Sequence, residues 1–271
     1  MTGRAALLAG WGAAIAATLG AGPDQSAGGR YRSAHLRCAG FAETVRTRIR
    51  GESGGATVAD QAGRDGLLVV RARDSIDGLA IEAWYDSLAV WRATDTGRES
   101  PDVEGFLGGR YRGWLSLTGE YRGRAVPFVP EEVGDVADLS PVMKEFFPLL
   151  PPIDLAVGRE WRDPTGLEIR RVADQRDVTG RETIRRYQWN GVRRVADRTE
   201  VTDSLAVTVD QLIRERGELQ WSMAMGPLSW TRHLVITARI PARGGVRQTV
   251  TSMIEQDVTV VRRFDLEGCR R

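Results

Sequence analysis

The chain has 271 residues, of which 42% are hydrophobic and 27% charged, with 31 glycines and 11 prolines. This balance excludes a disordered chain, a collagen-like chain and a protein with many membrane spans. The length permits one large domain or two small ones, either able to bury a core. A formal net charge of +2 gives no chain-wide field that would favour nucleic acid as a partner.

Residues 1–22 carry an export pattern. Arg4 is the only charged side chain in this segment, and an apolar run follows from residue 5 to residue 22. A positive start before a short apolar core predicts a signal peptide. The run is also close to the lower length limit of a membrane span, so an uncleaved signal anchor is the alternative. We therefore expect a periplasmic or exported protein, free or anchored to the inner membrane through residues 5–22.

The chain has two cysteines, Cys38 and Cys269, one near each end of the expected mature protein. In an oxidising periplasm they could form a disulfide, which would nominally contribute about 4–5 kcal/mol through the entropy of the unfolded chain. Two unpaired thiols are the alternative. His35 and His233 are the only histidines, and neither forms a ligand cluster with a cysteine. We therefore expect no metal site and no cofactor.

Alternating apolar and polar residues recur along the chain and predict strands. The first example is Val45 to Ile49, where apolar or β-branched residues alternate with arginines. Leu79–Tyr85 repeats the pattern before a turn predicted at Asp86-Ser87, and Tyr111–Leu117 repeats it before a turn predicted at Thr118-Gly119. Later runs cover Leu205–Ile213, Leu219–Met225, Ser229–Ile240 and Gln248–Phe264. The sequence predicts a mainly β protein with a long antiparallel curved sheet, as a half-barrel or two β lobes, with one short helix and an N-terminal signal or anchor helix.

The dipeptide Asn190-Gly191 is typical of a two-residue hairpin turn. Both residues accept the positive φ angles that a type I′ turn requires. The sequence therefore predicts a hairpin that joins Thr183–Trp189 to Val192–Val201. On this interpretation the substitution Gly191→Val would cost roughly 1–2 kcal/mol, because a β-branched residue resists positive φ.

Residues 127–153 interrupt the strand pattern with six prolines and an acidic patch. Ser140 and Pro141 are typical of an N-cap and a first helical residue, and they predict a short helix over Val142–Phe147. Because the following residues are strongly apolar, we expect this segment to dock on the sheet, with a lid over an apolar pocket as the alternative. The expected organisation is a signal peptide or anchor at 1–22, a β-rich lobe at 23–126, this connector at 127–153, and a second β-rich lobe at 154–271.

Tryptophans and arginines interleave along the expected strands. Such a mixture is found in proteins that bind single-stranded nucleic acid. The interleaving is better explained by a sheet with tryptophans on its core face and arginines on its opposite, solvated face. The export pattern and the small net charge favour this explanation. We expect no nucleic-acid partner.

One catalytic pattern is present, around Ser53. Residues 51–55 match the spacing G-x-S-x-G, but a nucleophile elbow needs a helix after the serine, and residues 56–66 show no helical apolar stripe. A base would have to be His35 or His233, and no spacing supports either. We predict that Ser53 lies exposed in a loop between strands with neither histidine beside it. No catalytic residue is predicted, and enzyme activity is not expected.

A resemblance covers roughly residues 150–264. Asp154–Trp161, following Pro151-Pro152, resembles the opening of a segment seen in uncharacterised exported β-rich bacterial proteins, and Gly217–Pro241 is similar to its strand-turn-strand ending. The layout of such proteins is similar to that of the periplasmic lipoprotein carriers, whose half-barrel sheet holds acyl chains under a helical lid. The resemblance implies a role with a lipid or another apolar ligand.

The leading hypothesis is an exported, non-enzymatic binding or scaffold module at the bacterial cell envelope. The first alternative is a periplasmic carrier of a lipid or other apolar ligand, which predicts a cavity between the sheet and residues 127–152. The second is an accessory subunit of a membrane protein complex, which predicts an exposed apolar patch and an envelope protein partner. The third is a hydrolase that uses Ser53.

Overall fold

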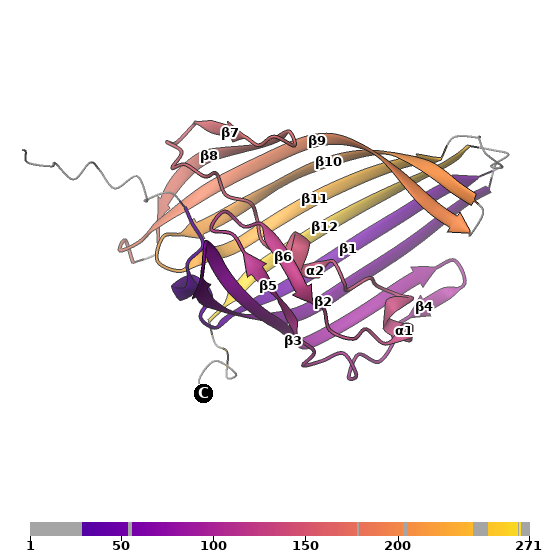
Figure 1. Cartoon of the computed structure of the whole chain (residues 1–271), viewed down its shortest axis with the longest axis horizontal. Coiled ribbons are helices and arrows are strands. Elements are labelled where there is room, and N and C mark those ends of the chain that lie inside the picture. Colours follow the sequence, from indigo (N-terminus) through magenta and orange to yellow (C-terminus); the bar gives the residue numbers. More distant parts are fainter. Residues whose placement is uncertain are drawn as a thin grey trace, which may run out of the picture.

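The computed structural model describes residues 29–53, 56–177, 179–202, 205–240, 249–264 and 266. It shows one large, open, curved sheet of twelve antiparallel strands with two short α-helices over one face (Figure 1). The strand order is β6-β5-β3-β2-β1-β12-β11-β10-β9-β8-β7, with β4 paired to β3. The predicted mainly β fold with a long antiparallel curved sheet is therefore confirmed.

Short turns or loops join most consecutive strands and helices. The strands are β1 (Ala39–Ser53), β2 (Ala56–Ser75), β3 (Gly78–Thr94), β4 (Gly97–Glu99), β5 (Tyr111–Leu115), β6 (Tyr121–Ala125), β7 (Glu160–Arg162), β8 (Leu167–Arg176), β9 (Thr183–Thr202), β10 (Leu205–Ser222), β11 (Gly226–Ile240) and β12 (Val250–Arg263). The helices are the 3₁₀ turn η2 (Ser33–Leu36), α1 (Glu131–Gly134) and α2 (Val142–Phe146).

The first and last long strands pair with each other. β1 and β12 are antiparallel partners from the pair Gly40 and Arg263 to the pair Glu52 and Thr251. This pairing joins the strands of residues 39–125 to those of residues 160–263 in one sheet (Figure 1). At the other side, β8 pairs with β9 only as far as Gly191, so the rest of β9 has β10 as its one described neighbour.

The predicted type I′ hairpin at Asn190-Gly191 is wrong. Both residues lie in the middle of β9, opposite Arg216 and Glu215 of β10, and neither has a positive φ. β9 pairs with β10 both before and after this dipeptide along the strand. This continuous pairing outweighs the local preference of Asn190-Gly191 for a turn. The predicted break between Ile213 and Leu219 is absent for the same reason, since β10 runs through both segments.

Two other predicted turns have opposite outcomes. Asp86-Ser87 lies inside β3, where Leu67 pairs with Ser87 and Leu68 with Tyr85, so Asp86 is the extra residue of a β-bulge instead of a turn. The turn at Thr118-Gly119 is confirmed between β5 and β6, and Gly119 has a φ of 103°. A Cβ atom there would also lie 2.5 Å from the carbonyl oxygen of Pro148.

The core lies on the face of the sheet that η2, β5, β6 and α2 cover, which we call the inner face (Figure 1). Phe41 is fully buried there, with its ring 5.5 Å from the rings of Phe146 and Trp230. The predicted docking of the connector is confirmed. Its buried side chains are Val133, Val136, Leu139, Val142, Met143, Phe146, Phe147 and Leu150. The predicted helix is present as α2, with Pro141 in place of Ser140 as its N-cap.

The tryptophans divide between two environments. Trp189, Trp221 and Trp230 belong to the core cluster, as expected for a core face. Three others are instead covered by arginine guanidinium groups, so the prediction is wrong for them. The pairs are Arg110 over Trp84 at 3.7 Å, Arg98 over Trp91 at 4.5 Å and Arg122 over Trp114 at 5.5 Å. Cation–π contacts of this kind combine apolar burial with a solvated charge.

In the described ranges no helix is both long and apolar enough to cross a membrane. Residues 1–22, with the predicted signal or anchor, lie outside the described residues.

Candidate ligand cavity

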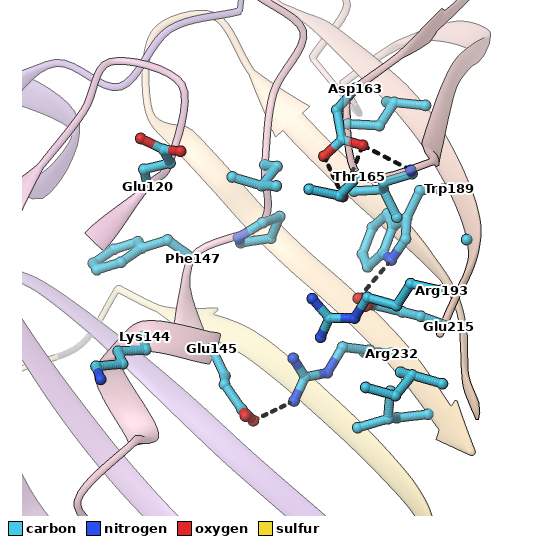
Figure 2. Close-up of a pocket in the computed structure, with 18 of the residues that line it drawn as sticks. Glu120, Lys144, Glu145, Phe147, Asp163, Thr165, Trp189, Arg193, Glu215 and Arg232 are labelled. Carbon is cyan, nitrogen blue, oxygen red and sulfur yellow. Dashed lines mark hydrogen bonds and ion pairs between the residues drawn. The ribbon is translucent and has the colours of Figure 1, made fainter. Parts of the chain in front are cut away.

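A cavity of about 440 Å³ lies between the inner face and the segment that contains α2 (Figure 2). Residues 144–149 and the β5–β6 turn form one wall, and strands β8 to β12 form the floor. Small-molecule sites have volumes of roughly 300–1,000 Å³, so the space is sufficient for a small ligand. The apolar residues that line it are Tyr121, Phe147, Pro148, Leu149, Leu167, Ile169, Trp189, Val192, Ile213, Trp230, Leu234 and Val258.

Two glycines shape the floor of the cavity. Because Gly217 has no side chain, the Trp189 ring packs directly against its backbone. A Cβ atom at this position would overlap the ring and the carbonyl oxygen of Thr231. Gly191 faces Leu167 across the β8–β9 pair, where a Cβ atom would lie 3.0 Å from the Leu167 side chain. Alternation along the strands places both glycines and Leu234 on the inner face.

The β7–β8 turn closes one end of the cavity. Asp163-Pro164-Thr165-Gly166 forms this turn, with a φ of 92° at Gly166. The Asp163 carboxylate accepts hydrogen bonds from the Thr165 hydroxyl at 2.8 Å and from the Leu167 backbone N–H at 2.8 Å. These bonds fix Thr165 and Leu167 at the cavity wall (Figure 2).

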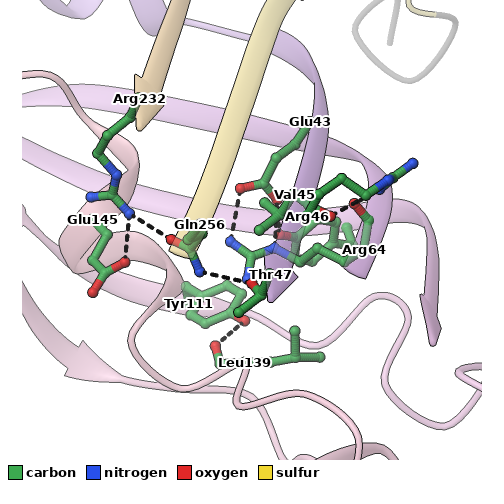
Figure 3. A network of polar contacts seen from close by, with 11 residues as sticks. Glu43, Val45, Arg46, Thr47, Arg64, Tyr111, Leu139, Glu145, Arg232 and Gln256 are labelled. Carbon is green, nitrogen blue, oxygen red and sulfur yellow. Dashed lines mark hydrogen bonds and ion pairs between the residues drawn. The ribbon is translucent and has the colours of Figure 1, made fainter. Parts of the chain in front are cut away.

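An ion pair joins α2 to the floor of the cavity. Arg232 of β11 donates to Glu145 of α2 at 2.8 Å and to the side-chain oxygen of Gln256 at 3.2 Å (Figure 2). Gln256 in turn donates to the Thr47 hydroxyl at 3.3 Å (Figure 3). The Nε atom of Arg232 is buried and has no hydrogen-bond partner among the described residues. Arg232 thus retains one unused donor beside the cavity.

The cavity lining carries charged side chains of both signs, and they differ in their partners. Glu215 accepts a hydrogen bond from the Trp189 indole at 3.2 Å, and Glu145 is held by Arg232. By contrast, neither Lys144 nor Arg193 forms an ion pair with a described side chain, although both line the cavity. Each lining carboxylate thus has a hydrogen-bond or ion-pair partner, Asp163 in its own turn and Glu120 with Arg122 at 3.8 Å, whereas two positive side chains have no ion-pair partner among the described residues.

Tyr121 contributes to the wall formed by the β5–β6 turn. Burial raises the pKa of its hydroxyl to about 12, so the group keeps its proton at physiological pH. Its oxygen has no hydrogen-bond partner among the described residues. The hydroxyl is buried toward Gly113, so the ring of Tyr121, and not its oxygen, forms the cavity wall.

A second polar network lies on the inner face, outside the cavity lining (Figure 3). Arg64 binds the buried Glu43 carboxylate through two hydrogen bonds of 3.0 and 2.9 Å, and the Tyr85 hydroxyl donates to it at 2.6 Å. Burial alone would raise the pKa of Glu43, but the charge of Arg64 and these hydrogen bonds outweigh it and hold the pKa below its ordinary value. The carboxylate is saturated by protein donors, so its role is structural.

The structure does not bring Ser53 close to a histidine. Ser53 is the last residue of β1, paired with Ala56, so its predicted place in a loop is wrong: pairing continues to the end of the strand. His233 pairs with Asp257, in the row that continues to Arg46 of β1. Arg46 precedes Ser53 by seven residues, or about 23 Å at 3.3 Å per residue. His35 lies beyond that row, where its ring contacts Trp221.

The predicted pairing of Cys38 with Cys269 stays a prediction, because Cys269 lies outside the described residues. Among the described residues, no three metal-ligating side chains gather into a group that could hold a metal ion.

No family model matches the sequence, and no curated protein sequence matches it. Among solved structures, a lipovitellin described for its lipid–protein interactions has a TM-score of 0.36 and 8% identity over 84% of this chain; the chain spans 25% of that protein. The β domain of the Bordetella autotransporter BrkA has a TM-score of 0.26 and 11% identity, covering 83% of this chain and 99% of that domain. A LolA superfamily protein from Nitrosomonas europaea has a TM-score of 0.17 and 9% identity, covering 84% and 88%. Scores this low carry no argument about function.

Several cavity residues were missed by the sequence reasoning. Trp189 and Arg232 were seen only as parts of strand patterns, and Glu145 only as part of a short helix. Their common signal is their position on the inner face, which follows from strand register and not from local sequence. The lid alternative for residues 127–152 pointed to the correct wall of the cavity.

Proposed function

We propose that the protein is an exported, non-enzymatic binding protein that carries an amphiphilic small molecule in this cavity. The single observation that carries the proposal is the cavity itself, a space of about 440 Å³ between the inner face and α2 that is lined by both apolar and charged residues. A lining of mixed character suits a ligand that has an apolar part and a polar part. The export pattern of residues 1–22 supports a place in the cell envelope.

The polar groups of the cavity favour binding over catalysis. Its carboxylates Glu145 and Glu215 are engaged by Arg232 and Trp189, and Ser53 lies at the far end of β1. A nucleophile needs a base within hydrogen-bond reach. The lining hydroxyl of Thr165 donates to the Asp163 carboxylate, but this carboxylate also accepts from the Leu167 backbone N–H, and the pair fixes the β7–β8 turn. The accessory-subunit and scaffold hypotheses remain alternatives without a specific contact to support them.

Filling the cavity tests the proposal. We expect purified protein to enhance the fluorescence of N-phenyl-1-naphthylamine, an apolar probe that emits strongly only when removed from water. Leu234→Trp places a larger ring on the cavity floor and should abolish this enhancement. Val235→Trp is the matched control, because Val235 points to the opposite face of β11 and should leave the signal unchanged.

A second variant separates loss of the site from loss of the fold. Thr165→Trp at the exposed β7–β8 turn should also reduce probe binding without altering the thermal midpoint of unfolding. The proposal fails if wild-type protein gives no enhancement, or if both cavity variants fold and bind the probe as the wild type does.

A further inference from the structure

We infer that the ligand is an anionic amphiphile with a single acyl chain. Its head group binds at Arg193, and its chain lies across a row of four isoleucines on the inner face. This inference rests on the proposed binding function and adds to it the chemical class and orientation of the ligand.

The isoleucines form one row because of strand register. Ile213 of β10 is directly opposite Ile236 of β11, which is opposite Ile254 of β12, which is opposite Ile49 of β1. Residues directly opposite each other in a sheet point to the same face. Ile236 lies two residues from Leu234 on β11, so the row continues the cavity floor.

The row is apolar but only partly covered. Ile213 is 8% exposed, and the other three isoleucines are half-buried. None of the four belongs to the main core cluster, which holds Phe41 and Val258 of the same strands. Apolar side chains in a continuous, half-exposed row gain free energy when a ligand chain covers them.

The length of the row selects the size of the chain. Ile213 and Ile49 are three strand spacings apart, or about 14 Å at 4.8 Å per spacing, which matches an extended acyl chain of roughly twelve carbons. A chain laid across the strands would contact all four side chains. Shorter chains would leave part of the row in water.

The two ends of the row differ in charge. Arg193 of β9 is opposite Ile213, lines the cavity, and points from the sheet toward α2 (Figure 2). No described carboxylate is within ion-pair distance of its guanidinium group. At the other end, Asp60 is opposite Ile49 and is already bound by Arg92 at 2.6 Å. An available positive charge at one end and a neutralised pair at the other favour an anionic head group at Arg193.

Carboxylate and phosphate head groups both fit a guanidinium group, which donates two parallel hydrogen bonds to either. The shared chemistry is therefore an anionic oxygen head group on one chain. The ligand is then either a free fatty acid or a phosphate ester. Comparing the affinities of the protein for one example of each distinguishes the two.

Calorimetric titration of the full-length protein at pH 8 tests the inference. The probes are sodium dodecanoate, dodecyl phosphate, neutral monododecanoylglycerol, cationic dodecyltrimethylammonium and the shorter octanoate. We expect at least one of the two anionic dodecyl ligands to bind roughly tenfold tighter than the neutral one, and the cation to bind weakest. Octanoate should bind at least roughly tenfold weaker than dodecanoate, since each buried methylene adds to affinity.

Two pairs of variants locate the head group and the chain. Arg193→Gln should weaken the preferred anion about fivefold and leave monododecanoylglycerol unchanged. Arg194→Gln is the control, because this neighbouring exposed arginine lies on the opposite face. Ile236→Ser should weaken every dodecyl ligand, whereas Val235→Ser on the opposite face should not.

The possible failures are distinguishable. Equal affinities for the neutral and anionic ligands, or equal effects of Arg193→Gln and Arg194→Gln, would overturn the inference and leave the binding function standing. Absence of binding by every ligand would overturn both. Tighter binding of dodecanoate assigns a fatty acid, and tighter binding of dodecyl phosphate assigns a phosphate ester.

Discussion

The inner face has two regions that differ in what covers them. Around Phe41 and Trp230, the face is closed by η2 and α2, and its side chains pack ring against ring. Around Ile236 of β11 and Ile254 of β12, two strands that also contribute to this core, the side chains are only half-buried. The same alternating sequence pattern thus yields a closed core in one part of these strands and, in another part, a half-buried apolar row that we propose as the binding surface for the ligand chain.

The contrast extends to the polar groups. In the covered region the Glu43 carboxylate is saturated by Arg64 and Tyr85. In the region next to α2, Arg193 is exposed and forms no ion pair with a described side chain. Buried donors without a partner occur in both regions, the Trp221 Nε1 atom in the covered one and the Arg232 Nε atom beside α2, so the contrast rests on the exposed charge.

The largest expected effect compares the two regions directly. Phe41→Ala removes a fully buried ring and should lower the free energy of unfolding by about 4 kcal/mol. Ile254→Ala, in the half-buried row, should lower it by about 1 kcal/mol and instead weaken dodecyl ligands. Urea unfolding and ligand titration of both variants provide the measurement. Similar stability losses would show that the row is part of the core.

The next effect concerns the Glu43–Arg64 pair. Glu43→Gln removes the charge of a carboxylate that is only 3% exposed and that Arg64 and Tyr85 bind, and should cost about 3 kcal/mol, measured by urea unfolding at pH 7. Glu145→Gln breaks a pair whose carboxylate is 49% exposed, and should change stability by less than about 1 kcal/mol. A comparable cost for both substitutions would contradict the distinction between the covered and open regions.

The same pair predicts a dependence on pH. The pKa of Glu43 is lower in the folded protein than its ordinary value of 4.5, so the folded state binds fewer protons in acid than the unfolded state. Its stabilising contribution is complete above pH 4.5 and is lost as the pH falls through the lowered pKa. Unfolding midpoints measured from pH 6 to pH 3 should therefore fall less steeply for Glu43→Gln than for the wild type.

The smallest effect is expected at Gly191. Gly191→Val should change stability by less than about 1 kcal/mol, because valine favours a strand and the contact at 3.0 Å is with the end of the Leu167 side chain. It should nevertheless reduce probe binding by narrowing the cavity. Gly217→Val is the contrast, since its Cβ atom would overlap backbone, and it should be clearly destabilising. A large loss of stability for Gly191→Val would favour a strained turn.

Local sequence was sufficient for the strands and for α2. The alternation from Val45 to Ile49 and the pair Ser140-Pro141 each predicted an element close to where it lies. Local sequence was misleading at Asn190-Gly191, where the turn preference of two residues competes with pairing along most of a long strand. Neighbouring strands decided the outcome there, and a single strand's sequence does not contain them.

Neither the cavity nor the isoleucine row beside it could be predicted, because both depend on the register between several strands. The row from Ile213 to Ile49 joins residues that are far apart in sequence and adjacent only after pairing. A one-residue slip in any pair would move one of these side chains to the opposite face. The site is therefore a property of the assembled sheet, while its parts look like ordinary strand residues.

The unpaired part of β9 has a consequence for solubility. Past Gly191 this strand has β10 on one side and no described strand on the other, which leaves a row of backbone donors and acceptors open. Its sequence there includes the adjacent pair Arg193-Arg194 and the charged residues Asp197, Arg198 and Glu200. Charges on an open edge oppose the addition of a strand from another molecule, so a sheet of this width can remain free of edge-to-edge aggregation.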